Sequence, residues 1–419
     1  MFGSLLLLTL AAPDPIAWIH DDWAKAKAAA LEEKKLVAID VWATWCHSCL
    51  SMKNFTLKEA PLAEVASTHV WLALDYDLPA NAAFFARFPI SAFPTFMVVD
   101  PAKDEVVARW LGSGSAAQMA AFFAGAKRDA DDAVSRGHKA LAAQRWEEAA
   151  KLFEGALAER GVDRARALSG YIEALWKLDP KRCAETGVGM LDDTDDTAPG
   201  IDFALLVAYC AESLDEAARK PVLAKVRTRL ERAAANPGLP LSADERSGLF
   251  DSLIGIYDQL GEVEAAGAAV ERRLAILEAA ARAAKTPGER ATFDAHRLAC
   301  YLRLSRFELA EKMLLASETA LPADFNHPWR LSVLYKTMGQ LERASAAIER
   351  ALQKGYGPRK VRLHSAKIEL LVAQKKAGPA AKALDEARSY LASLDPALVR
   401  AAWVAELDEK AKAVAGLPR

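Results

Sequence analysis

The chain has 419 residues, which at roughly 100–200 residues per domain predicts two or three domains. Its 54 lysines and arginines nearly balance its 56 acidic residues, so we expect no long-range attraction to nucleic acid or to an acidic membrane surface. The sequence is 52% hydrophobic but has no apolar run of about 18 residues, which predicts a globular protein without a transmembrane span. Five cysteines are too few for a scaffold held together by disulfides.

Residues 1–15 form a short apolar segment that ends in small residues. This pattern resembles a secretory signal and favours an extracytoplasmic protein, either periplasmic or secreted. The basic residue that normally precedes the apolar core is missing, because the first lysine is Lys25. The alternatives are an apolar N-terminal strand or a misplaced start, and with either of them a cytoplasmic protein.

Residues 16–127 alternate between helical and extended patterns, as a compact α/β domain does. An alanine-rich stretch over 21–35 predicts a helix. Nearly continuous apolar runs predict strands that are buried on both faces. The strands predicted in this segment are 36–42, 70–74, 95–99 and 105–110, and the last two are separated by proline and aspartates that favour a hairpin turn.

Residues 128–419 are rich in alanine, leucine, glutamate and arginine, which favour helix. A repeated frame has a bulky residue, then a small or polar residue four positions later and an alanine nine positions later. Its clearest copies, Tyr301–Ala310 and Tyr335–Ala344, lie 34 residues apart. The frame recurs seven times, with its middle residue at Gln144, Asp179, Ser213, Gly261, Ser305, Gly339 and Lys375.

This frame resembles the tetratricopeptide repeat. The resemblance implies an all-α solenoid of stacked helical hairpins over 128–419, whose concave face binds a peptide or protein ligand. The alternative is a generic helical bundle in which alanine-rich helices match the frame by chance.

Cys46 and Cys49 lie directly after the strand predicted over 36–42, in the stretch Trp-Cys-His-Ser-Cys. A helix that begins near His47 aims its free N–H groups at the sulfur of Cys46, which favours the thiolate. Such surroundings lower a cysteine pKa from about 8.5 to roughly 3.5–7.5. Cys49, one turn further along the helix, is placed to attack a mixed disulfide at Cys46. The spacing therefore predicts a redox-active dithiol.

Three separated features agree with this prediction. They are the run from Asp40 through Trp42 and Trp45 to Cys46 and Cys49, the segment Phe93-Pro94-Thr95-Phe96, and the glycine-containing passage over 112–122. In this order and spacing they make residues 16–126 resemble the thioredoxin family. The resemblance implies a thioredoxin-like α/β domain and a thiol-disulfide oxidoreductase that acts on protein substrates carrying disulfides or thiols.

The resemblance also implies the role of each site residue. Cys46 would be the attacking thiol, Cys49 the resolving thiol, and Asp40 a buried carboxylate that accepts the proton of Cys49. Pro94 would follow a cis peptide bond beside the dithiol and would keep metal ions away from it. The residues expected to contact the substrate are Trp45, His47, Phe93 and Thr95. No metal and no other cofactor are expected.

The sequence departs from the family pattern at two places. Ala73 stands where many thioredoxins carry a lysine near the buried aspartate, which puts the proton path in doubt. The dipeptide His47-Ser48 between the cysteines matches neither the reducing nor the oxidising relatives. A protonated His47 would favour the thiolate of Cys46 and so raise the midpoint potential, although the helix N-terminus opposes a cation there by about 0.3–1 kcal/mol.

The remaining cysteines, Cys183, Cys210 and Cys300, are predicted to lie alone in separate helical repeats as buried structural residues. A structural zinc site on Cys46 and Cys49 is an alternative use of the pair, but the sequence offers no second pair of ligands at a suitable spacing.

Two hypotheses about function remain open. In the first, the dithiol turns over disulfides in protein substrates that the helical repeats recruit. In the second, the repeats are an interaction scaffold and the thioredoxin-like domain is a redox-responsive accessory. The hypotheses differ in whether the chain turns over a disulfide in another molecule.

Overall fold

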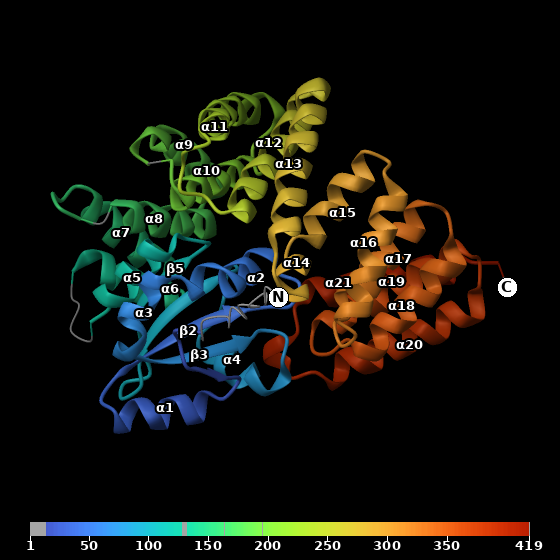
Figure 1. The fold of residues 1–419 in the computed structure, drawn as a ribbon, viewed down its shortest axis with the longest axis horizontal. Helices are drawn as coiled ribbons and strands as arrows, with labels where there is room; N and C mark the ends of the chain where they lie inside the picture. Colours follow the sequence, from blue (N-terminus) through green and yellow to red (C-terminus); the bar gives the residue numbers. More distant parts are fainter. Residues whose placement is uncertain (1–13, 128–131, 163, 195, 419) are drawn as a thin grey trace, which may run out of the picture.

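The computed structural model describes residues 14–127, 132–162, 164–194 and 196–418. The apolar segment predicted over 1–15 therefore lies outside the described residues, apart from its last two positions. Figure 1 shows an α/β domain (blue) and an array of helices that curves over it from green through yellow to red. Among the described residues, no helix is long and apolar enough to cross a membrane.

The α/β domain is built on a five-stranded sheet in the order β1-β3-β2-β4-β5. The central strand β2 pairs in parallel with β3 and antiparallel with β4, and it is buried on both faces as its apolar run predicts. The four predicted strands are confirmed, and the short β1 is additional. The strand bounds are β1 (Trp18–His20), β2 (Leu36–Trp42), β3 (His69–Asp75), β4 (Thr95–Asp100) and β5 (Glu105–Leu111).

Helices cover both faces of this sheet. The apolar side chains of α1 and α4 pack on one face, and those of α3 and α5 on the other, so the domain has three layers. The predicted helix over 21–35 is confirmed as α1. The helix bounds are α1 (Trp23–Glu32), α2 (His47–Asn54), α3 (Ala60–Val65), α4 (Ala82–Arg87) and α5 (Ala116–Gly125), with short 3-10 turns at Thr56–Lys58, Ala66–Thr68 and Pro79–Asn81.

The rest of the chain folds into helical hairpins that stack on one another, so the predicted solenoid is confirmed. The first hairpin helices are α6 (Ala133–Ala142), α8 (Arg164–Leu178), α10 (Ala198–Ala211), α12 (Ala243–Leu260), α15 (Asp294–Arg303), α17 (Asn326–Thr337) and α19 (Arg359–Ala373). The second are α7 (Trp146–Leu157), α9 (Pro180–Gly189), α11 (Glu216–Ala235), α13 (Val263–Ala283), α16 (Phe307–Ala320), α18 (Leu341–Lys354) and α20 (Ala377–Ser393). The helices α14 (Pro287–Ala291) and α21 (Ala401–Ala415) lie outside these pairs, and 3-10 turns occur at Leu191–Asp193 and Pro396–Leu398.

The middle residue of the sequence frame lies in the hairpin turn of every repeat. Five of these residues have a positive φ: Gln144, Gly261, Ser305, Gly339 and Lys375. Small or polar residues are preferred there because a left-handed backbone is costly for bulky side chains.

The third repeat departs from the frame. Its bulky residue, Tyr209, is 60% exposed, whereas the corresponding Tyr301 and Tyr335 are buried. Its alanine, Ala218, is also exposed, whereas Ala310 and Ala344 of the clearest copies are buried. In this repeat α10 therefore presents side chains to the space between the array and the α/β domain.

The prediction that Cys183 and Cys210 lie alone is wrong. They form a disulfide between α9 and α10, with Cα atoms 5.7 Å apart. Both residues face the buried interior of the hairpin stack, where neighbouring helices bring together residues that are 27 positions apart. Cys300 is free and buried, and burial raises the pKa of its thiol to about 11, which makes it a poor nucleophile.

Replacing both Cys183 and Cys210 by alanine should lower the free energy of unfolding of the helical array by about 2–4 kcal/mol, because the unfolded chain would regain the freedom of the closed loop. Thermal unfolding followed by circular dichroism measures this loss. The double variant should keep the reactivity of Cys46 and Cys49. An unchanged melting temperature under oxidising conditions would contradict the prediction.

Candidate active site

The dithiol lies at the junction of β2 and α2. Cys46 is the N-cap of α2, and its Sγ accepts a hydrogen bond from the backbone N–H of Cys49 at 3.1 Å. The two sulfurs are bonded as a disulfide at 2.04 Å. Cys46 is 5% exposed and Cys49 is fully buried. An attacking thiolate at Cys46 would thus be the more accessible one and would lie at the positive end of the helix dipole.

The segment after α4 brings Pro94 to the dithiol, and the predicted cis peptide bond between Phe93 and Pro94 is confirmed. The aromatic ring of Phe93 packs against the cluster of Ala43, Cys46 and Cys49. The ladder of β4 begins at Thr95, so the backbone of Phe93 lies just before the sheet pairing. Thr95 itself is fully buried and donates its hydroxyl to the carbonyl of Ala92, so it supports the loop from inside rather than facing a substrate.

Trp45 is held from both sides. Its indole Nε1 donates to Asp77 Oδ2 at 2.6 Å, and its ring packs edge-on against Phe93. The guanidinium of Arg359, from α19, lies 4.4 Å from the ring centroid. Burial raises the pKa of Asp77 to about 6, and the hydrogen bond from Trp45 opposes that shift. Trp45 therefore links the dithiol loop to the helical array.

Asp40 lies in the middle of β2, directly opposite Ala73 of β3. Burial raises the pKa of its carboxyl to about 7, and the ammonium group of Lys53 partly opposes this rise. Lys53 belongs to α2 and also lies 3.6 Å above the ring of Trp42. A cavity of about 190 Å³ lined by Asp40, Lys53 and Ala73 reaches this carboxyl.

The sequence of the neighbouring strand offers no cation near Asp40, since Ala73 lies opposite it. The structure places Lys53 there from the helix that follows the dithiol. The sequence does contain a signal for this contact. Lys53 lies seven residues after Cys46, and two helical turns bring a side chain back to the same face of the helix. The role of Asp40 as a proton acceptor stays a prediction.

His47, the first residue of α2, points to the helical array. Its Nδ1 lies 3.2 Å from both carboxylate oxygens of Asp244, in α12. Its ring also packs against the ring of His296, in α15, with the centroids 3.6 Å apart. His47 is therefore held at the start of α2 by two residues of the array.

A cavity of about 390 Å³ opens between the dithiol and the array. On one side it is lined by His47, Ser48, Phe93 and Pro94, and on the other by residues of α10 and α12. Apolar side chains on the array side are Ile201, Phe203, Leu205, Leu206, Tyr209 and Leu249, and acidic ones are Asp202, Asp244, Glu245 and Asp251. Tyr209, displaced from the repeat frame, is thus part of this wall.

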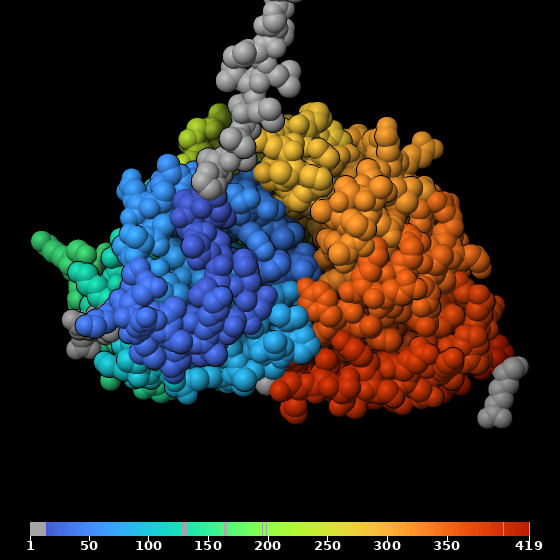
Figure 2. All heavy atoms as spheres, turned by 60° about the horizontal axis from the view of Figure 1, so that its bottom comes forward, coloured from blue at the N-terminus to red at the C-terminus, as the bar shows by residue number. Residues whose placement is uncertain are grey.

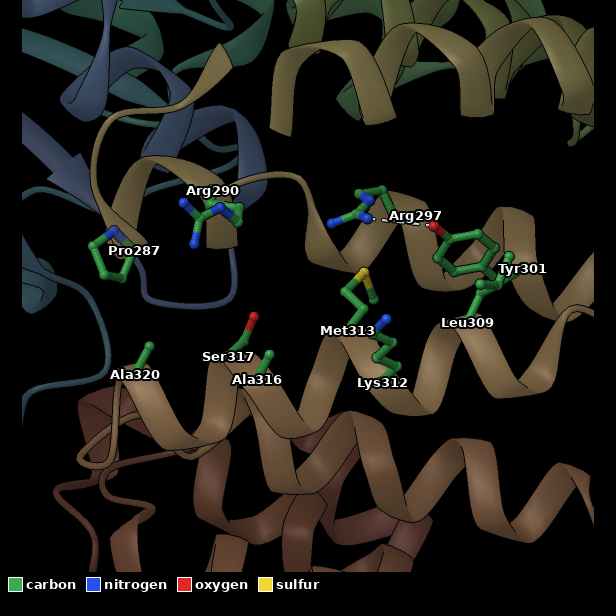
Figure 3. A pocket seen from close by; sticks show the side chains of 10 residues that line it. All are labelled: Pro287, Arg290, Arg297, Tyr301, Leu309, Lys312, Met313, Ala316, Ser317 and Ala320. Carbon is green, nitrogen blue, oxygen red and sulfur yellow. Dashed lines mark hydrogen bonds between the residues drawn. The ribbon is translucent and has the colours of Figure 1, made fainter. Parts of the chain in front are cut away.

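A third cavity, of about 270 Å³, lies among α14, α15 and α16 (Figure 3). The guanidinium of Arg297 donates to the hydroxyl of Tyr301 across its upper wall. None of its lining residues belongs to the dithiol or the cis-proline segment. The cavity at Pro94 is therefore the candidate substrate site.

Comparison with known proteins agrees with this geometry. Residues 18–101 match a family model described as thioredoxin-like. Thioredoxin H3 of Arabidopsis thaliana is 34% identical over 102 residues, which cover 21% of this chain and 79% of that protein. The chain belongs to the thioredoxin-like family.

The sequence similarity between this thioredoxin-like protein and its relatives lies in the α/β domain. Thiol:disulfide interchange protein DsbD of Pseudoalteromonas atlantica is 31% identical over 82 residues, or 19% of this chain. The chain spans only 14% of that protein, and 17% of its counterpart in Colwellia psychrerythraea.

Solved structures of helical-repeat proteins are also similar in part. A tetratricopeptide repeat protein from Parabacteroides merdae, 13% identical, covers 68% of this chain and 98% of its own with a TM-score of 0.45. The TPR2AB domain of yeast Sti1, 17% identical, has the same coverage and a TM-score of 0.28. Both scores are below 0.5, so the description of the array rests on its own hairpins.

The array of this thioredoxin-like protein also contacts the loop in front of the dithiol. Asn326 donates to the backbone carbonyl of Thr44 at 3.2 Å, and the hydroxyl of Tyr356 donates to the carboxylate of Asp75. In Figure 2 the α/β domain (blue) and the later helices (orange and red) meet along one boundary. The dithiol is therefore framed by α10 and α12 on one side and by the last repeats on the other.

Gly357 marks the closest approach at this boundary. Its φ is 53°, and a Cβ added to it would lie 1.6 Å from the backbone carbonyl oxygen of Asp77. Only glycine fits, because any side chain would push the array away from the domain. These contact residues were missed by the sequence analysis. The one local signal was the Tyr356-Gly357-Pro358 stretch, which predicts a turn.

Proposed function

We propose that this protein is a thiol-disulfide oxidoreductase that exchanges the Cys46–Cys49 disulfide with protein substrates held in the cavity at Pro94. The observation that carries the proposal is the position of Cys46, at the N-terminus of α2 and in the cluster against which Phe93 packs, directly before the cis bond to Pro94. A substrate segment in this cavity would contact His47 and Ser48, the residues between the two cysteines, and would reach Cys46 before the fully buried Cys49.

The exchange transfers two electrons from the dithiol to the substrate disulfide in two consecutive steps. With the dithiol reduced, the thiolate of Cys46 attacks a substrate disulfide, forms a mixed disulfide and releases one substrate thiolate. The thiolate of Cys49 then attacks the sulfur of Cys46, which closes the Cys46–Cys49 disulfide and releases the second substrate thiolate. The substrate is reduced and the dithiol oxidised, and the reverse sequence oxidises a substrate dithiol.

The helical array is proposed to select the substrate. Its wall of Leu205, Leu206 and Tyr209 offers apolar contacts, and the backbone of Phe93 is available for pairing with an extended chain.

We also propose an extracytoplasmic location. The Cys183–Cys210 disulfide supports it, because buried structural disulfides persist in oxidising compartments and are rare where thiol reductants are abundant. Thiols in freshly lysed source cells can be blocked with a mass-shifting reagent. Protein with Cys183 and Cys210 fully alkylated would reject this location.

The proposed activity is tested by equilibrating the purified chain across a series of reduced-to-oxidised glutathione ratios. The Cys46–Cys49 peptide is then quantified by mass spectrometry after alkylation, separately from Cys183, Cys210 and Cys300. We expect a reversible two-electron transition with a midpoint above the roughly −270 mV of thioredoxin and below about −120 mV. A dithiol that stays unreactive at every ratio would refute the oxidoreductase and favour the interaction scaffold.

A further inference from the structure

Three potential metal ligands from three helices meet at the edge of the cavity at Pro94. His47 comes from α2, Asp244 from α12 and His296 from α15. Each side chain offers one ligand atom, and the three atoms lie within 4.8 Å of one another. The side chains of Asp244 and His296 are 3% and 9% exposed, and that of His47 is 34% exposed.

The separations suit a metal ion of the first transition row. His47 Nδ1 lies 3.2 Å from Asp244 Oδ1, and His296 Nδ1 lies 3.9 Å from the same oxygen. With metal–ligand bonds of about 2.0–2.2 Å, a separation of 3.2 Å corresponds to an angle of about 100° at the metal, close to tetrahedral. The 3.9 Å separation of Nδ1 places the His296 ring beside the same carboxylate, and the ligand atoms of all three residues lie within 4.8 Å of one another.

A second layer of contacts orients His296. Ser247 Oγ lies 2.8 Å from its Nδ1 and also accepts a hydrogen bond from Arg273 Nε at 3.1 Å. In the tautomer with the proton on Nδ1, His296 donates to Ser247 and keeps the lone pair of Nε2 free. Metal-binding histidines are commonly fixed in this way, through the ring nitrogen that does not bind the metal.

We propose that His47, Asp244 and His296 form a binding site for a divalent transition-metal ion, of which Zn²⁺ is the test case. Two imidazoles and one carboxylate are ligands that such ions prefer, and three protein ligands leave a position open. That position faces the cavity, because all three side chains line it. Water or a substrate group takes the open position.

The site needs no thiol. Cys46 and Cys49 are bonded to each other in this structure, so the cation binds through nitrogen and oxygen alone. Because its ligands come from both the α/β domain and the array, a bound ion holds α2 against α12 and α15. The site does not depend on the proposed exchange activity, although one of its ligands, His47, directly follows Cys46 in the sequence.

The test is titration of the untagged, full-length Cys46→Ser/Cys49→Ser variant with zinc chloride by isothermal calorimetry. This variant lacks the dithiol. Zinc binding to its thiols therefore cannot be mistaken for binding at the proposed site, and the result does not depend on redox activity. We expect one saturable site per chain, and binding at least about tenfold weaker after Asp244→Asn or His296→Gln. His20→Gln, an exposed histidine outside the cluster, is the matched control and should bind as before.

Thermal unfolding with and without zinc provides the second readout. The ion should raise the melting temperature of the parent and of the His20→Gln control, and not that of the ligand variants. If a buried substitution prevents folding, His47→Gln serves, because His47 is partly exposed. Absence of a one-to-one site in the parent, or unchanged affinity in the ligand variants, would overturn the proposal.

Discussion

A Cys49→Ser variant should accumulate a stable mixed disulfide between Cys46 and its protein substrates. Cys46 is the N-cap of α2 and the more exposed of the two cysteines, so its thiolate is favoured by the helix and is the one that a substrate reaches first. Cys49 is fully buried behind it, and its removal leaves nothing to resolve the adduct. The adduct is measured on non-reducing gels and by mass spectrometry of the linked peptides.

The reciprocal Cys46→Ser variant should form no adduct, and its exchange rate should fall by at least about 10³-fold, because the nucleophile itself is lost. Cys300→Ser is the matched control: Cys300 is a free cysteine buried in α15, and its removal should leave the rate unchanged. Adducts that form through Cys49, or equally in both variants, would show that the assigned order of the two thiols is wrong.

Replacing Asp40 by asparagine should stabilise the protein at pH 8 by up to about 4 kcal/mol and change its stability little at pH 4. In the folded protein Asp40 keeps its proton up to a pKa of about 7, because burial penalises the carboxylate. In the unfolded chain the proton leaves near pH 3.9. Between these values the folded state binds more protons than the unfolded state, so stability falls by about 1.4 kcal/mol per pH unit as the pH rises.

Denaturant unfolding at pH 4, 6 and 8 measures this effect. Asparagine resembles the protonated carboxyl and does not titrate, so the difference from the parent should grow with pH and level off above about pH 7. Asp385→Asn, an exposed aspartate on α20, is the matched control and should give a difference that is the same at each pH. An Asp40→Asn curve parallel to that of the parent from pH 4 to pH 8 would contradict the raised pKa.

The same variant separates stability from catalysis. If Asp40 takes the proton of Cys49, then Asp40→Asn should slow the release of substrate from the mixed disulfide by about 10²-fold, the usual contribution of general base catalysis. The formation of the mixed disulfide should be unaffected, because Cys46 is favoured by the helix instead. Stopped-flow mixing of reduced enzyme with a disulfide peptide resolves the two steps.

The sequence by itself determined the features that depend on neighbouring residues. The strand over 36–42, the helix after Cys46, the proline segment and the hairpin turns of the repeats all follow from local spacing, because backbone periodicity and turn chemistry act over a few residues. This local information was enough to predict a thioredoxin-like domain and a helical solenoid.

Only the tertiary structure decided which distant residues meet. The curvature of the array brings Asp244 and His296 to His47 and places Gly357 against Asp77. These contacts between the array and the domain depend on small rotations between successive repeats that accumulate along the solenoid, and no local pattern records their sum. The bond between Cys183 and Cys210, which the sequence left apart, is set instead by the packing of the consecutive helices α9 and α10.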